Sequence, residues 1–293
     1  MKYIFFLFQL LLFTSVNAQN KELKINYFCP RWGFESMDWE TFCNKVKTTG
    51  YDGVETPIPA NPVEKQAMLS SLKKYNLLLI GMCFYNPQSD FNISVENFKH
   101  DLRNIASLKP YLINCHTGKD FMTFEQNKTL IENGSLIAKE SGIKIVHETH
   151  RGRFTYAANI TKTYIDKIPD IKFTLDISHW CNVHESFLED QIENVNAVLA
   201  HTEHIHSRIG FPEGPQVNDP RAPEWENALN KHLVWWDKVI EFQKSKGSTI
   251  FSITTEFGPP GYMPTLPYTQ QPVSSQWDIN VYMMNTLKKR FAK

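Results

Sequence analysis

The chain has 293 residues, with 31 basic and 31 acidic side chains, and therefore a formal net charge of zero. No basic stripe is visible, so the composition argues against a protein that binds nucleic acid. Apart from its first residues, the chain has about the length of one (β/α)8 barrel, and no linker or change in composition divides it. We therefore expect one domain.

The first residues have the pattern of a targeting segment. Lys2 precedes an almost wholly apolar stretch over residues 3–13, and Val16 and Ala18 are small residues at the positions that a signal peptidase reads. An N-terminal membrane anchor is the alternative, but the apolar stretch is short for a bilayer span. The sequence predicts a signal peptide over residues 1–18 and a mature domain over residues 19–293. We expect a periplasmic or secreted protein with no membrane association after the signal is removed.

Five cysteines are scattered along the chain without a CxxC pair, at Cys29, Cys43, Cys83, Cys115 and Cys181. In an exported protein, an odd number leaves at least one free thiol. Because several of them lie in apolar, strand-like runs, we interpret them mostly as small core residues. One disulfide of unknown pairing stays open at this point.

Strand-like and helix-like segments alternate from residue 24 to the end. In chain order, short apolar runs predict strands at residues 24–28, 53–56, 77–84, 111–115, 143–147, 171–175, 203–205 and 250–255. Helical periodicity follows each strand, at residues 39–48, 63–75, 95–108, 124–141, 157–168, 187–199, 224–246 and 277–291. Eight such repeats predict an α/β fold, a single (β/α)8 TIM barrel. An open doubly wound sheet is the alternative, but no GxGxxG follows the first strand.

Metal-binding side chains end four successive strands in the C-terminal half of the chain. They are Glu148, Asp176, His206 and Glu256. The carboxyl ends of barrel strands meet at one rim, where barrel enzymes place their chemistry. Three carboxylates and one imidazole at that rim predict one divalent metal ion, and Mn²⁺, Mg²⁺, Co²⁺ and Zn²⁺ all suit such mixed ligands.

Each of these four residues, taken alone, also fits a purely structural role. A single carboxylate at a strand end more often caps the next helix or pairs with a basic neighbour. Capping does not explain four such residues. The first three follow one another at intervals of roughly 30 residues, which is about the length of one β/α repeat. His204 is the rival of His206 as a ligand, but it lies one layer deeper on the same strand face, so we assign it a supporting role.

These motifs resemble the xylose isomerase-like (β/α)8 superfamily, in particular its ketose 3-epimerase and inosose dehydratase branch. The resemblance implies one divalent ion held by Glu148, Asp176, His206 and Glu256. The sequence Asp176-Ile-Ser-His179 is similar to the Asp-x-x-His motif of the family, whose histidine contacts substrate. The chain departs from the family after the seventh strand, where residues 208–216 replace a motif that often continues to an acidic residue. The substrate preference of a family member therefore does not transfer.

The expected ligand set suits proton abstraction next to a carbonyl group. A divalent ion polarises a carbonyl and hydroxyl pair and stabilises the enediolate, while carboxylates remove and return the proton. The resemblance assigns these acid–base roles to Glu148 and Glu256, and so predicts a metal-dependent sugar isomerase or epimerase. Export and the lack of a phosphate-cradling loop argue against sugar phosphates. We expect an unphosphorylated carbohydrate or polyol as the small-molecule substrate.

Several histidines and one arginine are candidates for binding this substrate. The resemblance implies that His179 and Arg208 hold substrate oxygens. His150 shares a strand face with Glu148 and could do the same, or it could be satisfied by a loop carbonyl. His116, at the end of the fourth strand, is a weaker candidate.

Aromatic residues near the expected barrel mouth are candidates for a sugar platform. Trp32 follows the first strand and Trp180 follows His179, so a stacked sugar ring and simple rim packing are both open readings. Tyr262 and Tyr268 lie in the Pro/Gly-rich stretch after the eighth strand and are candidates for a lid.

Three other functions remain as alternatives. A metal-dependent lyase or dehydratase would start from the same enolate and eliminate from a keto-sugar, such as an inosose or a 3-keto-glycoside. A non-catalytic sugar-binding barrel would need no acid–base pair. The apurinic endonucleases of this fold use a larger, His-rich trinuclear cluster, for which the N-terminal half offers only His116 and Glu55. Barrels of this kind often pair through their helices, so a homo-oligomer is also open.

Overall fold

A computed structural model describes residues 22–292 of the chain. The signal peptide predicted over residues 1–18 lies outside the described residues. Within the described range, no helix is both long enough and apolar enough to cross a membrane.

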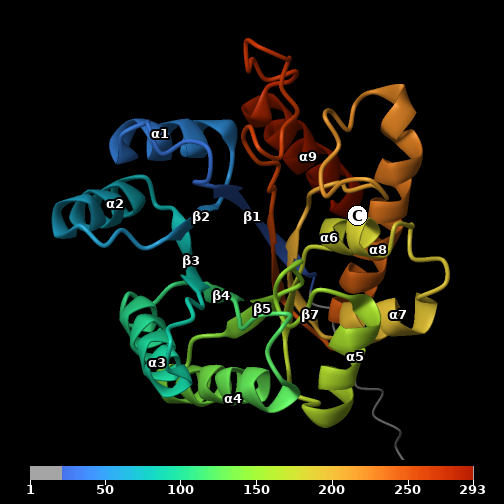
Figure 1. Ribbon diagram of the computed structural model, residues 1–293. Coiled ribbons are helices and arrows are strands. Elements are labelled where there is room, and N and C mark those ends of the chain that lie inside the picture. Colours follow the sequence, from blue (N-terminus) through green and yellow to red (C-terminus); the bar gives the residue numbers. More distant parts are fainter. Residues whose placement is uncertain (1–21, 293) are drawn as a thin grey trace, which may run out of the picture.

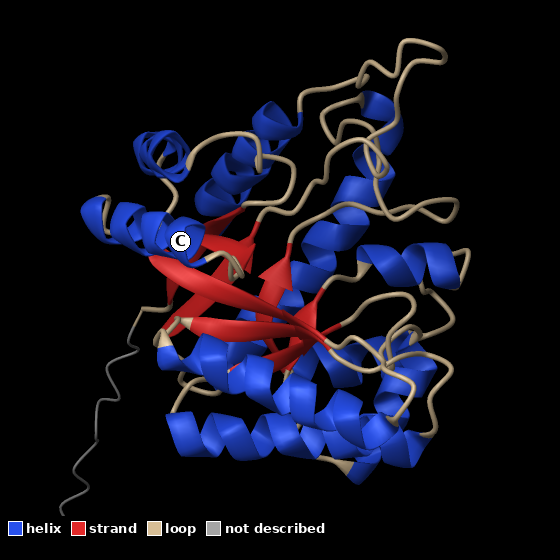
Figure 2. Cartoon of the chain, turned by 60° about the vertical axis from the view of Figure 1, so that its left-hand side comes forward, coloured by secondary structure: helices blue, strands red, loops and turns tan. Residues whose placement is uncertain are grey.

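Within residues 22–292, eight parallel strands close into a barrel in which each strand pairs with its neighbour in sequence and β1 pairs with β8. The strands are β1 (Lys24–Pro30), β2 (Gly53–Pro57), β3 (Leu78–Phe84), β4 (Leu112–His116), β5 (Ile145–Glu148), β6 (Phe173–Leu175), β7 (Thr202–His206) and β8 (Ile250–Thr254). Figure 2 shows the strands in red with the helices in blue around them. The predicted TIM barrel is confirmed.

The helices cover the outside of the barrel (Figure 1). They are α1 (Trp39–Thr49), α2 (Pro62–Lys74), α3 (Phe91–Ser107), α4 (Phe124–Ser141), α5 (Ala158–Lys167), α6 (Ser178–Val183), α7 (Ile192–Ala200), α8 (Glu226–Ser245) and α9 (Gln276–Phe291), with the 3-10 helix η1 (Pro223–Trp225) before α8. Local sequence sets their ends. Helix α4, for example, begins at a capping box of Thr123 and Gln126 and ends at Gly142, whose φ of 71° is left-handed.

The connection between β6 and β7 differs from the prediction. The periodicity predicts one helix over residues 187–199, but the structure has the short α6 and then α7, which begins only at Ile192. Between them Glu185 and Leu188 adopt left-handed backbone angles, with φ of 46° and 62°. Such angles interrupt a right-handed helix, and a pattern of apolar residues does not reveal them.

The inside of the barrel is closed by hydrophobic side chains below its mouth. Phe28, Ile80, Leu112 and Val146 form this plug, while a larger core lies between the strands and the helices. Because the lower interior is filled, a cavity and polar side chains are left at the carboxyl ends of the strands.

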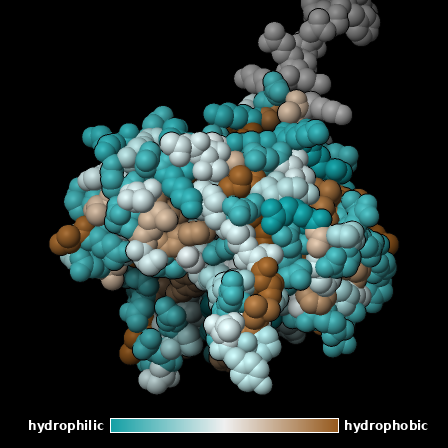
Figure 3. Space-filling view, turned by 90° about the horizontal axis from the view of Figure 1, so that it is seen from above, coloured by the Kyte–Doolittle hydropathy of each residue, from teal (hydrophilic) through white to brown (hydrophobic). Residues whose placement is uncertain are grey.

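All five cysteines are buried and free, so reading them as core residues is confirmed and no disulfide forms among them. On the face seen in Figure 3, hydrophobic side chains lie apart from one another among hydrophilic ones. That face therefore shows no continuous apolar patch. The homo-oligomer that the sequence leaves open stays open.

Candidate metal centre and active site

The structure brings the four predicted metal ligands together at the barrel mouth. Glu148 and His206 are the last residues of β5 and β7, and Asp176 and Glu256 follow β6 and β8. All four side chains are buried. One possible ligand atom from each residue lies within 4.8 Å of those of the other three. Their role as ligands stays a prediction, but the required proximity is present.

Unsatisfied atoms in this cluster fit a cation. His206 Nδ1 lies 2.8 Å from Glu256 Oε2 and 3.7 Å from Glu148 Oε2. Apart from this ion pair, neither His206 Nδ1 nor Glu256 Oε2 has a hydrogen-bond partner within the described part of the chain, although both are buried. Most buried polar atoms are hydrogen-bonded. Three carboxylates and an imidazole are a donor set for a divalent ion, so these residues fit the metal that the sequence predicts.

Electrostatics in the cluster also favour a cation. Burial raises the pKa of Asp176 to about 6; Arg208 opposes this shift, whereas the neighbouring Glu256 and Glu148 reinforce it. For Glu148, burial is outweighed by His116 and His206, so its pKa lies well below the usual value. For His206, burial is outweighed by Glu256, Glu55 and Glu148, so its pKa lies well above the usual value. The centre therefore concentrates negative charge around the imidazole.

Arg208 is fixed in the middle of the site. Its guanidinium pairs with Asp176 and donates to Ser178 Oγ at 3.2 Å and to His179 Nε2 at 2.8 Å. It also lies 4.6 Å from the centre of the Tyr262 ring. His179 is fully buried against Arg208 and does not line the cavity. This position does not give His179 the direct access to substrate that the sequence predicts. The short helix α6 sets this position, because it turns the chain inward directly after Asp176.

Two further histidines stand beside Glu148. His116 Nε2 lies 2.9 Å from Glu148 Oε2, and the ring centres of His116 and His150 are 4.8 Å apart. His150 Nδ1 lies 2.5 Å from the carbonyl oxygen of Arg151, which can only accept, so this nitrogen carries the proton. Burial, with His116 beside it, lowers the pKa of His150 to about 3. The loop carbonyl foreseen for His150 is therefore present, and the other ring nitrogen is left as an acceptor.

A cavity of about 250 Å³ opens at this centre. Its walls combine the polar residues described above with apolar and aromatic ones. The lining residues are Trp32, Glu35, Pro57, Met82, Phe84, His116, Glu148, His150, Arg208, Glu256 and Tyr262. Trp32 and Tyr262 meet edge to face with ring centres 5.0 Å apart, so both rings form part of the cavity wall.

Two of the aromatic candidates do not line the cavity. Trp180 is fully buried, and its indole N–H donates to the carbonyl oxygen of Thr155 at 2.8 Å, so it cannot form a sugar platform. The cause is again α6, which rotates Trp180 into the core. Tyr268 is completely exposed and does not line the cavity. Tyr262 alone of the expected lid pair borders the site.

Sequence reasoning missed two residues below the metal ligands. Asn114 on β4 donates from Nδ2 to Glu148 Oε2 at 2.7 Å and to Glu55 Oε1 at 3.0 Å. The sequence suggested Glu55 only as an extra ligand in the metal cluster of an endonuclease. The sequence signal that could have revealed these two residues is a polar residue within each of two apolar, strand-like runs. His204 has the predicted supporting position, since its Nε2 lies 3.3 Å from Glu55 Oε2.

A parallel barrel with a buried His/Glu/Asp cluster at its mouth defines a (β/α)8 protein with a potential metal site. The chain belongs to the xylose isomerase-like TIM barrel family, whose family model matches residues 43–262, more than half of the sequence. No curated protein matches it significantly.

Solved structures share the fold at low sequence identity. D-allulose 3-epimerase from Methylomonas sp., in complex with D-allulose, is 14% identical with a TM-score of 0.61, over 92% of this chain and 98% of that one. A probable 3-DHS dehydratase from Bacillus anthracis is 15% identical with a TM-score of 0.59, over 90% and 99%. A xylose isomerase-like TIM barrel protein from Mycobacterium smegmatis, in complex with magnesium, is 10% identical with a TM-score of 0.59, over 91% and 97%. At these identities the similarity shows the fold alone.

Proposed function

We propose that the protein is an exported, divalent-metal-dependent sugar isomerase or epimerase. It acts on an unphosphorylated carbohydrate or polyol by removing a proton next to a carbonyl. The observation that carries this proposal is the buried cluster of Glu148, Asp176, His206 and Glu256, whose donor atoms meet at the barrel mouth. Membership of the family, and the fold shared with an epimerase and with a magnesium complex, support it.

Each carboxylate of the acid–base pair approaches from its own part of the barrel. A bound divalent ion would polarise the substrate carbonyl and stabilise the charge of the enediolate. Glu148 comes from β5 and Glu256 from the end of β8, and these strands are not neighbours. One carboxylate removes the proton and the other returns one from a different side, which inverts the carbon.

The remaining polar residues hold the sugar. Arg208, already held by Asp176 and Ser178, donates to a substrate oxygen without reorganising. The unprotonated nitrogen of His150 accepts from a hydroxyl, and His116 lies beside Glu148 at the same wall.

Replacing Trp32 by Ala should raise KM by about 2- to 10-fold with little change in stability, since an aromatic contact contributes about 0.5–1.5 kcal/mol. Trp180→Phe is the matched control. It loses a buried hydrogen bond to Thr155 and should lower stability while leaving KM unchanged. Steady-state kinetics and thermal unfolding of both variants separate the two roles. An unchanged KM in Trp32→Ala would remove Trp32 from the substrate site.

Proton exchange tests the proposed chemistry directly. The mature protein, loaded with diamagnetic Mg²⁺ or Zn²⁺, is incubated in D₂O with free ketoses, inososes and 3-keto-glycosides, and the substrates are followed by NMR. We expect metal-dependent deuterium uptake at a carbon next to the carbonyl. Bound metal without exchange on any substrate would overturn the acid–base assignment and favour a sugar-binding barrel.

A lyase or dehydratase is the second candidate, supported by the fold shared with the probable 3-DHS dehydratase. It would begin with the same proton abstraction and then expel a leaving group from the keto-sugar instead of returning the proton. The products of the same experiment decide. An epimer retains all its heavy atoms, whereas elimination yields an unsaturated ketone and a released group.

A further inference from the structure

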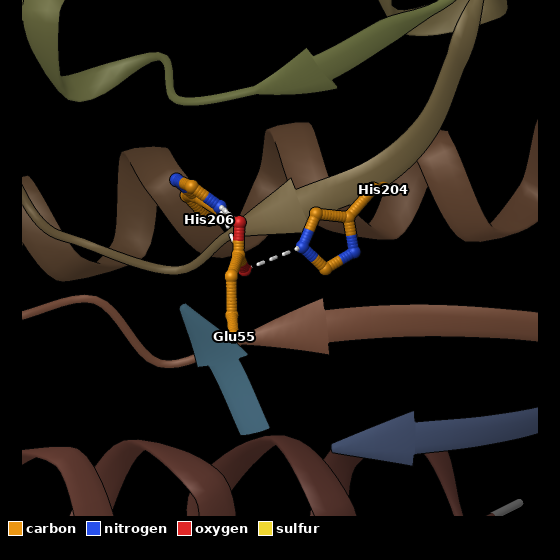
Figure 4. Close-up of side chains that lie close together, drawn as sticks. All are labelled: Glu55, His204 and His206. Carbon is orange, nitrogen blue, oxygen red and sulfur yellow. Dashed lines mark hydrogen bonds and ion pairs between the residues drawn. The ribbon is translucent and has the colours of Figure 1, made fainter. Parts of the chain in front are cut away.

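Glu55 lies beneath the metal centre, although β2 is far in sequence from the predicted ligands. The residue is only 2% exposed. Figure 4 shows its carboxylate facing the rings of His204 and His206. His206 Nε2 lies 3.0 and 3.1 Å from the two Glu55 oxygens, and His204 Nε2 lies 3.3 Å from one of them. Thr254 also donates to this carboxylate.

We propose that Glu55 is a positioning residue that fixes the orientation and tautomer of His206 for metal binding. A carboxylate only accepts hydrogen bonds, so His206 Nε2 carries a proton and donates it to Glu55. When a metal ion binds, Nδ1, which faces Glu256 and Glu148, would then be the nitrogen that gives up its proton and offers its lone pair to the ion. A carboxylate behind a metal-bound imidazole holds the ring in place and raises its basicity.

Asn114 extends the same support to a second ligand. Its single Nδ2 group donates to Glu55 Oε1 and to Glu148 Oε2, so the position of Glu148 depends on that of Glu55. Through these contacts, β2 and β4 hold ligands that belong to β5 and β7. The N-terminal half of the barrel thus contributes to the centre without supplying a ligand.

The group of Glu55, His204 and His206 is itself compact enough to hold an ion. Hydrogen bonds already occupy the Glu55 carboxylate, however, because Asn114, Thr254 and His206 donate to it. An additional cation would have to displace these donors. We therefore assign Glu55 to the support of one metal ion rather than to a second site.

Titration with Mn²⁺ in a calorimeter tests the proposal, which rests on the metal-dependent function proposed above. Wild-type protein should bind one equivalent, and Glu55→Gln should bind it about 10- to 100-fold more weakly. Glu203→Gln is the matched control, because Glu203 precedes His204 on β7 but pairs with Lys144 away from the centre. It should bind like the wild type.

Each contrary outcome has a distinct meaning. Wild-type affinity in Glu55→Gln would overturn the positioning role while leaving the proposed function intact. Two equivalents in the wild type, with one lost in Glu55→Gln, would make Glu55 a ligand and overturn the proposal. No binding by the wild type would overturn both.

A second measurement does not depend on the folding of the variant. In the Zn²⁺-loaded wild type, long-range ¹H–¹⁵N NMR spectra should show His206 with a protonated Nε2 and a metal-bound Nδ1. A buried residue with a merely structural role would not determine this tautomer. Zinc on Nε2 would contradict the proposal.

Discussion

Glu148→Gln should reduce the rate of deuterium uptake by substrate by about 10³-fold, within the range for loss of an acid–base group. The substitution keeps the size of the side chain but removes the base. It also removes a charged partner of His116 and His206. The rate is measured by NMR in D₂O at saturating metal, so that weaker metal binding does not account for the loss.

Glu35→Gln is the control for this variant. Glu35 lines the same cavity, but its carboxylate accepts only from the backbone N–H of Gly33, at 3.0 Å, within the described residues. The same chemical change there should leave the exchange rate nearly unchanged. A Glu148→Gln protein that kept its exchange rate within a few-fold of wild type would show that another group is the base.

Saturating Mn²⁺ should raise the midpoint of thermal unfolding by about 10 °C over protein treated with a chelator. Three buried carboxylates converge at the centre, and the pKa of Asp176, raised to about 6 chiefly by burial, reflects the cost of charging that carboxylate there. A cation relieves that cost only in the folded state. A ligand at about 1,000 times its Kd adds about 4 kcal/mol, and about 2–4 °C follow from each kcal/mol at this size.

His206→Gln separates binding at the centre from a general effect of salt. This variant lacks the imidazole ligand, and its midpoint should respond little to Mn²⁺. Calorimetric scans with and without chelator provide the comparison for both proteins. Equal midpoints in the wild type with and without Mn²⁺ would contradict a metal site at the barrel mouth.

The fold was predictable because its signals are local. Each strand is a short apolar run and each helix has its own periodicity, so the repeat emerges without knowledge of long-range contacts. The exception is the segment after Asp176. There, an additional short helix, α6, precedes the predicted helix, and left-handed angles at Glu185 and Leu188 delay the start of α7 to Ile192. The spacing of apolar residues does not reveal such angles.

The metal-ligand candidates were predictable for a related reason. Once the chain is a barrel, every strand end must lie on the same rim, so Glu148, Asp176, His206 and Glu256 converge whatever the details of packing. The direction of a side chain after the strand has no such constraint. This is why Trp32 lies at the cavity as expected, whereas Trp180 turns into the core.

Local sequence patterns specify the repeat of strands and helices, and which ligand-type residues end the strands. The residues that support those ligands from beneath follow from the folded barrel. Glu55 on β2 reaches His206 on β7 only because the closed barrel places these strands across its interior, and Asn114 on β4 links Glu55 to Glu148 on the neighbouring β5. Contacts across a barrel depend on its closure and on side-chain direction. The local spacing of apolar and polar residues predicts neither of them.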